Sequence, residues 1–373
     1  MNRQQICFPS ANDLRSILTD SIKKTDLLRF ARRKGIFLFN ATQEDIAQRI
    51  SEMMLDYEEL NMLRTLAYKS TTKQLLCGFT LVSEANFDFA GIYNSLRDNG
   101  VLSEEGYSLK KISTITPSNG KVSYQGALSY KKKSAGRIEF IRTEERDVSF
   151  LMKEIEPNRW QVEVDGGKSN DGKAVYSMLE KAIKGRSIQI ESLRIDHLSN
   201  SDTISFFDSL AKGGLDEEEW KIEDIEGITL KRNAGTKDHD ETDSDYEEVS
   251  QEQLSGISRA ILEGKNLREN SFIKQAEESG YAFTSMVYVF RPKTNSQKVR
   301  LKAEFKGNPK IFEVCLESFL ETSTDKEDSY EDITSSMSEK DNINLRSVFW
   351  NNAKALYLDI REGRYSPNDR KKL

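Results

Sequence analysis

Three short stretches of this 373-residue sequence combine residue types that could do chemistry. The first is Glu304-Phe305-Lys306, which closes an alternating run, Val299 to Phe305, that predicts a strand. In metal-dependent nucleases, carboxylates hold the ion that activates water and a lysine steers the phosphate. Glu304 and Lys306 have these types and this spacing. However, no aspartate at a matching strand end precedes them, and Glu-x-Lys triplets arise by chance in a chain that is 31% charged.

The second stretch is Gly167-Lys-Ser-Asn-Asp-Gly172-Lys173, between a predicted strand and a predicted helix. Glycine-rich loops in this context cradle phosphates with backbone amides, and the lysine reaches the outer phosphates. Gly167, Gly172 and Lys173 are therefore candidate cofactor-binding residues. Against this, Ala174 replaces the Ser or Thr that would hold magnesium, the neighbouring strands look antiparallel, and turn formation explains the same residues.

The third stretch places His197 after Asp196 at a predicted strand end, where the pair could act as acid and base. No serine or cysteine nucleophile with a recognisable elbow accompanies them, so a structural histidine is the favoured interpretation. The chain has two histidines and three separated cysteines (Cys7, Cys77 and Cys315) without a CxxC pair. This composition predicts buried thiols, no metal site and no cofactor.

The clearest indication of function is a basic segment in a chain whose net charge is -6. Between positions 23 and 34 the only acidic residue is Asp26. Clustered cations can neutralise phosphates and release counterions, although a solvated helix face gives the same pattern. The candidate phosphate-contacting residues are Lys23, Lys24, Arg29, Arg32, Arg33 and Lys34.

The residues around this segment predict two helices joined by an extended connector. Gly35 stands where the first helix should be capped, and Thr42, with Asp45 three residues later, predicts the start of the second. The apolar residues of each helix recur on one face, Leu27, Leu28 and Ala31 in the first and Ile46, Ile50 and Met53 in the second.

This helix–extended–helix order over residues 24–50 resembles the SAP family of small DNA-binding motifs. The matching residues are Leu27, Leu28, the basic run before Gly35, Ile36, Ile46, Gln48, Arg49 and Ile50. The resemblance implies contact with the DNA backbone, which positions a protein without reading sequence. Two features depart from the family. Gln43 stands where lysine is common, and Phe37-Leu38-Phe39 replaces a small polar connector, which predicts packing of these residues on the rest of the protein.

A second basic patch is Lys131, Lys132 and Lys133, with Tyr124 and Tyr130 nearby. A hairpin tip of this composition could add phosphate contacts or base stacking. A solvated tip is the favoured interpretation of this patch.

The chain as a whole predicts an α+β fold in several segments. A helical module at 11–68 precedes a mainly antiparallel α+β domain at 76–232, an acidic linker at 234–249, and a smaller α+β domain at 250–360. Alternation and turn signals predict strands at 121–130, 137–142, 148–155, 159–164, 187–195, 281–291, 298–305 and 311–319. Helical periodicity predicts helices at 172–183, 203–210 and 345–360, and polarity predicts a loop at 321–341.

These observations lead to one functional hypothesis and two alternatives. No run of about 18 apolar residues and no signal peptide occur, so we expect a cytoplasmic protein without membrane contact. We expect a non-enzymatic, DNA-associated protein with a protein partner. An adaptor whose basic helix meets an acidic partner, and a metal-dependent nuclease or nucleotide-dependent effector, stay open. Such proteins occur in repair, mobile elements and antiviral defence, which is analogy only.

Overall fold

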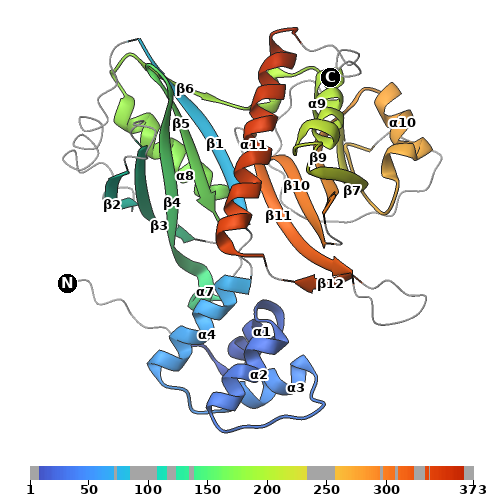
Figure 1. Cartoon of the computed structure of the whole chain (residues 1–373). Helices are drawn as coiled ribbons and strands as arrows, with labels where there is room; N and C mark the ends of the chain where they lie inside the picture. The colour runs from blue at the N-terminus through green and yellow to red at the C-terminus, as the bar shows by residue number, and fades with distance from the viewer. Residues whose placement is uncertain are drawn as a thin grey trace. The chain divides into compact units, whose positions relative to one another are not determined.

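The computed structural model (Figure 1) describes residues 8–70, 74–84, 107–115, 123–133, 138–232, 257–294, 297–306, 310–322, 332–335 and 337–364. Helices and a large sheet are both present, which confirms the α+β class. The predicted acidic linker at 234–249 lies outside the described residues. None of the described helices is long and apolar enough to cross a membrane.

The described strands pair in one sheet in the order β2-β3-β4-β5-β1-β11-β10-β9-β7-β8, with β6 also on β1 and β12 on β11. Their bounds are β1 Gln74–Ser83, β2 Tyr107–Ile115, β3 Ser123–Lys133, β4 Thr143–Glu156, β5 Arg159–Gly166, β6 Ile188–Ser192, β7 Trp220–Arg232, β8 Arg259–Glu263, β9 Tyr281–Pro292, β10 Gln297–Lys306, β11 Ile311–Thr322 and β12 Asp332–Ser335. The pairing of β1 with β11 joins strands from both predicted α+β segments.

The chain divides into two compact units. The first unit comprises Met1–Thr72, Ser95–Lys111 and Ala127–Val148. The second comprises Lys73–Asn94, Ile112–Gly126 and Ser149–Leu373.

The first unit contains a helical bundle with its own apolar core. Its helices are α1 (Ala11–Ser21), α2 (Lys24–Arg33), α3 (Gln43–Ser51) and α4 (Tyr57–Ser70). Ser10 and Thr42 begin α1 and α3 with reciprocal side-chain caps, each with an aspartate three residues later. The core residues include Leu18, Leu27, Phe30, Ile46, Ile50 and Leu63, which confirms the helical faces predicted for α2 and α3.

The predicted strand at 137–142 is wrong over its described part, because Glu139–Arg142 form the short helix α7. Phe140 and Ile141 both pack into the bundle core. A strand would send consecutive side chains to opposite faces, so burying both against one surface requires a helical turn. On α4, Arg64 donates to the carbonyl of Thr143 at 3.0 Å and lies over the Phe140 ring. These contacts fix the bundle to the start of β4.

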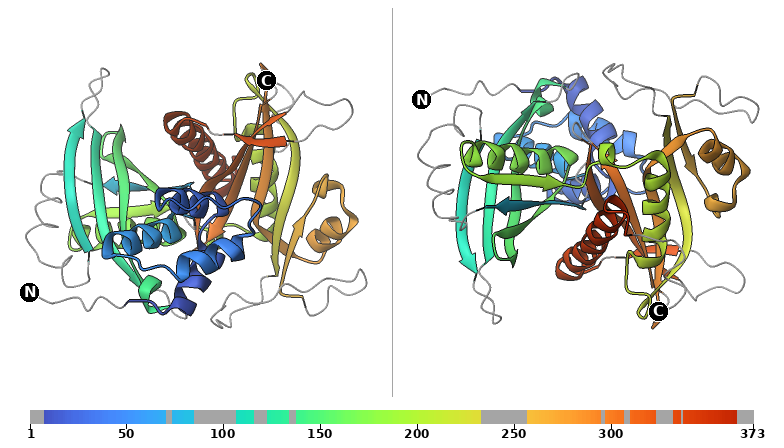
Figure 2. Two further views of the ribbon diagram at one scale, coloured as in Figure 1. Left: turned by 90° about the horizontal axis from the view of Figure 1, so that it is seen from below. Right: turned by 90° about the horizontal axis from the view of Figure 1, so that it is seen from above.

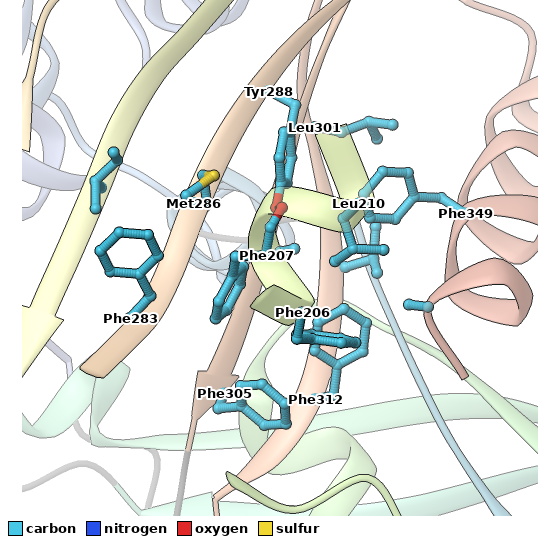
Figure 3. Packing of buried hydrophobic residues seen from close by; sticks show 14 of the residues in the cluster. Phe206, Phe207, Leu210, Phe283, Met286, Tyr288, Leu301, Phe305, Phe312 and Phe349 are labelled. Carbon is cyan, nitrogen blue, oxygen red and sulfur yellow. The ribbon is translucent and has the colours of Figure 1, made fainter. Parts of the chain in front are cut away.

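The second unit is built around a core rich in aromatic rings (Figure 3). Its longer helices are α8 (Ser169–Ile183), α9 (Asn200–Gly213), α10 (Ser271–Glu278) and α11 (Glu339–Arg361), with two short 3-10 turns, η1 (Ile195–His197) and η2 (Leu267–Glu269). Helices α9 and α11 pack together against β9–β11 (Figure 2). Phe206 and Phe207 of α9 meet Phe305 and Phe312 of the sheet, with ring centroids 5.4–5.9 Å apart.

Helix α11 starts earlier than the sequence predicts, at Glu339 rather than residue 345. Ser338 caps it by accepting from the Asp341 amide at 3.2 Å. The predicted loop at 321–341 is also interrupted by β12, which pairs with β11. Polar composition misled the prediction at both places, because a cap and an edge strand need few apolar residues.

The strands β10 and β11 present two different faces. Leu301, Ala303 and Phe305 of β10, with Phe312 and Val314 of β11, enter the aromatic core. Side chains alternate along a strand, so the residues between them lie on the other face. That other face carries charged residues, including Lys302, Glu304 and Glu313, and contains one of the predicted sites.

Candidate functional site

The basic residues of α2 lie opposite its buried face. Leu27 and Ala31 are fully buried in the bundle core, and Leu28 packs beside them. At about 100° per residue, Arg29, Arg32 and Arg33 occupy an arc of about 100° on the far side of the helix. All six candidate cations are exposed: Lys23, Lys24, Arg29, Arg32, Arg33 and Lys34. The fold therefore presents the segment as a cationic surface.

Two of these cations are engaged in ion pairs. Arg29 meets Asp26 one turn earlier at 3.1 Å, with 68% of its side chain exposed. Lys34 pairs with Glu59 of α4, which lowers the pKa of Glu59 mainly through the hydrogen bond from that lysine. Lys23, Lys24 and Arg32 form no ion pair with a described residue. Exposed pairs of this kind are weak, so a phosphate can compete for Arg29.

The end of α2 is a Schellman turn, as the position of Gly35 predicts. Gly35 has a φ of 77°, its amide donates to Arg32 O at 3.0 Å, and the Ile36 amide donates to Ala31 O at 2.9 Å. The connector then leads to Thr42, whose hydroxyl accepts from the Asp45 amide. The backbone geometry is therefore set by these few residues.

The connector does not pack as predicted. Leu38 is half-buried and contacts the bundle core. Phe37 and Phe39 are instead 67% and 87% exposed. The core of the bundle is filled by residues from the helices and by Leu38 itself, which leaves both rings at the surface.

Gln43 has a structural role at the position where the SAP family often has lysine. Its side-chain amide donates to the carbonyls of Thr19 at 2.5 Å and Ile22 at 2.9 Å. These carbonyls belong to the end of α1, where no further helical turn satisfies them. Gln43 therefore ties α3 to α1 and is not free to meet DNA.

The second basic patch forms the last three residues of β3. Lys131 and Lys133 are exposed, and Lys132 is half-buried. Tyr130 is only 7% exposed and stacks on Tyr107, and Tyr124 stacks on Trp160 at 5.6 Å. The two tyrosines are therefore packed on other rings, and base stacking by this patch loses its support.

Glu304 lies in a buried charged cluster. It pairs with Lys302 at 2.8 Å and stands directly opposite Glu313 of β11. Burial raises the pKa of Glu304, but the charge and hydrogen bond of Lys302, with Lys306 and a hydrogen bond to Glu313, together hold that pKa below its usual value. Neither Glu313 nor Lys302 was predicted, because the sequence pattern within either strand does not determine the register that joins positions 304 and 313. Lys306 is exposed on the same face.

This cluster continues onto β1, where Cys77 stands opposite Glu313. Burial, and then the charge of Glu313, raise the pKa of the Cys77 thiol far above its usual value, so it stays protonated and unreactive. No group of three or more metal-ligating side chains occurs among the described residues. Cys77 and Cys315 are buried free thiols, as predicted, and Cys7 lies outside the described residues.

The glycine-rich loop is occupied by a side chain of its own helix. Asp171 is fully buried, and its carboxylate accepts from the amides of Gly167 at 2.6 Å and Lys168 at 2.9 Å. A bound phosphate would need such amides. Gly172 packs on Cys77, with no room for a Cβ atom, and Lys173 is half-buried. Local packing therefore accounts for the residues that suggested nucleotide binding.

His197 joins a hydrogen-bonded anchor rather than an acid–base pair. Its Nδ1 lies 3.1 Å from the hydroxyl of Tyr357, which donates to Arg194 O at 2.9 Å. The Asp196 carboxylate faces Arg194 instead, and that hydrogen bond lowers the pKa of Asp196. These contacts fix η1 to α11, in agreement with a structural histidine.

Helix α11 covers a polar network that the sequence did not reveal. Arg346, 2% exposed, donates to Asn342 at 2.6 Å and to Asp165 of β5 at 2.8 Å. Further along, Glu163 accepts from Lys153 at 3.1 Å and from Gln161 at 2.8 Å. The alternation of Gln161, Glu163 and Asp165 predicts a solvent-facing side, and nothing local indicates that a helix far along the chain covers it.

Comparisons with known proteins add little to this description. No family model matches the chain, and no curated protein matches it. A solved structure, the di-domain ARO/CYC StfQ from the steffimycin biosynthetic pathway, has 9% sequence identity to this chain and a TM-score of 0.18. The match covers 77% of this chain and 98% of that one. At this TM-score the likeness carries no argument about fold or function.

Proposed function

We propose that this protein binds DNA through phosphate contacts made by the outer face of α2. The observation that carries the proposal is the arginine arc of Arg29, Arg32 and Arg33, with Lys23 and Lys24 at the start of the same helix. Cations displayed on a rigid helix can neutralise adjacent phosphates and release counterions. The helix itself is held by the bundle core, so the backbone positions of these residues are fixed relative to one another.

Two further features support this reading over the alternatives. The carboxylates and amides of the other candidate sites are engaged in internal contacts, as Glu304 is by Lys302 and the loop amides are by Asp171. The net charge of -6 repels DNA from most of the surface, so binding would be confined to a local basic face. Contacts to phosphate alone predict affinity without sequence preference.

The test is the salt dependence of binding to a short duplex. We expect the logarithm of the binding constant to fall linearly with the logarithm of salt concentration, by about 0.9 per phosphate neutralised. For the variant Arg29→Ala/Arg32→Ala/Arg33→Ala, the slope should be shallower by about 2 to 3, which corresponds to the loss of three phosphate contacts. Fluorescence anisotropy of a labelled duplex measures both.

The matched control removes three exposed lysines of the second unit and changes the net charge by the same amount. This variant is Lys212→Ala/Lys221→Ala/Lys274→Ala. It should keep the slope of the wild type, because its cations are not part of α2. Equal slopes for the wild type and the arginine variant, or no binding by the wild type at low salt, would refute the proposal and direct attention to an acidic protein partner.

A further inference from the structure

We infer that the connector between α2 and α3 binds single-stranded nucleic acid by stacking bases on Phe37 and Phe39. This inference rests on the proposed function and names the ligand more closely. It starts from the two most exposed aromatic side chains among the described residues, at 67% and 87%. Each leaves a large apolar ring in water, which is unfavourable unless a ligand covers the ring.

The exposure pattern of the connector is regular. Ile36 and Leu38 are half-buried, and Phe37 and Phe39 between and after them are exposed. Leu38 packs on the bundle core, which anchors the segment from below. Alternate residues of an extended chain project to the same side, about 6.6 Å apart. Two rings at that separation can hold one flat base between them, since it equals about two of the 3.4 Å stacking distances found between bases in a duplex.

The charge beside the rings selects the kind of partner. Arg32, Arg33 and Lys34 directly precede the Schellman turn that leads into the connector. Single-strand binding sites combine cations that follow the backbone with aromatic side chains on which bases stack. A duplex keeps its base faces stacked inside, so it can use the cations but not the rings. A single strand can use both, and the two features together therefore favour it.

The test compares three probes of equal length: oligothymidylate, an abasic strand and a duplex. The wild type should bind oligothymidylate about 5- to 100-fold more tightly than the abasic strand, the range expected for one stacked base. Phe37→Ala/Phe39→Ala should lose this difference and keep its affinity for the duplex. Phe37→Tyr/Phe39→Tyr should retain it, since the rings are preserved.

The matched control is Phe8→Ala, which removes a ring that is 63% exposed and precedes α1. It should bind all three probes like the wild type. Circular dichroism checks that each variant keeps its helices, which is expected because neither connector ring belongs to the bundle core.

The outcomes separate this inference from the proposed function. Equal binding of oligothymidylate and the abasic strand overturns the stacking inference alone, provided that the duplex still binds with a steep salt slope. The stacking inference is also overturned if Phe37→Ala/Phe39→Ala still prefers oligothymidylate over the abasic strand as strongly as the wild type does. It is overturned as well if Phe8→Ala reduces that preference by the same amount. Absence of binding to any probe overturns both proposals, and the rings would then serve to dock a protein.

Discussion

The charged cluster at Glu304 makes a quantitative prediction about the stability of the second unit. Lys302 and Glu304 form a pair whose side chains are 21% and 11% exposed, and Glu313 stands opposite Glu304 on the next strand. The two single substitutions should therefore differ. Lys302→Met removes the counter-charge and leaves two carboxylates facing each other, whereas Glu304→Gln removes one of those carboxylates and keeps an acceptor for Lys302.

The magnitudes follow from burial. Removing one partner of a fully buried ion pair costs about 3–5 kcal/mol, and the partial exposure of Lys302 and the nearby Lys306 reduce this, so we expect about 2–3 kcal/mol for Lys302→Met. For Glu304→Gln we expect about 1 kcal/mol, since the hydrogen bond survives in neutral form.

The pH dependence follows from the direction of each pKa shift. The pKa of Glu304 is lowered in the folded protein, so its contribution is present above its unfolded value and is lost as pH falls through the folded one. Burial lowers the pKa of Lys302, but Glu304, together with Glu317 and Cys315, raises it above its usual value, so the stability that Lys302 contributes is lost only at alkaline pH. In Lys302→Met the carboxylates lack this counter-charge. The difference in free energy of unfolding between this variant and the wild type should therefore narrow as pH falls below about 5, where the carboxylates become protonated.

Urea denaturation followed by tryptophan fluorescence measures these effects in the right part of the protein. All three tryptophans, at positions 160, 220 and 350, belong to the second unit. A larger loss for Glu304→Gln than for Lys302→Met would refute the reasoning. The reasoning would also fail if magnesium raised the urea midpoint of the wild type but not that of Glu304→Gln. Glu304 would then hold a metal ion.

Three further predictions concern single positions. Burial, and then Arg159, lower the pKa of Lys354 to about 8, so the unfolded chain binds this proton more tightly. Lys354→Met should stabilise the protein near pH 7 by about 1 kcal/mol, with the gain vanishing near pH 10 in urea titrations. Gly172→Ala should cost about 2 kcal/mol, since its Cβ would lie 2.2 Å from Cys77 Sγ, and Cys77→Ala in that background should restore most of the loss. Thr42→Ala should cost the bundle about 1 kcal/mol in thermal melts followed by circular dichroism.

The parts of the fold that the sequence predicts are those governed by neighbouring residues. The caps at Thr42 and Gly35 are local patterns of hydrogen bonding and backbone geometry, and both form as predicted. The strands β9, β10 and β11 follow from alternation, and the structure confirms each with slightly longer bounds. Helices α8 and α9 are likewise confirmed.

The errors arise where a distant element decides the outcome. The stretch 139–142 is helical because the bundle core takes up two consecutive side chains. Glu163 is buried because α11, nearly two hundred positions later, covers it with Ser347. Glu313 meets Glu304 through the register between β10 and β11, which the pattern within either strand does not determine. Periodicity reports which residues share a face, but it does not report what covers that face.

The two units depart from ordinary burial in opposite ways, and the contrast bears on function. In the second unit, buried polar side chains such as Arg346 and Glu163 have partners that compensate for their loss of water, so their burial is accounted for within the fold. In the bundle, Phe37 and Phe39 remain 67% and 87% exposed although the sequence predicts packing, so the described residues do not bury either ring. A local rule broken without internal compensation is expected at binding sites. The rings follow α2, which carries the arginine arc, within one segment of the bundle, and this proximity is the basis of the proposals made above.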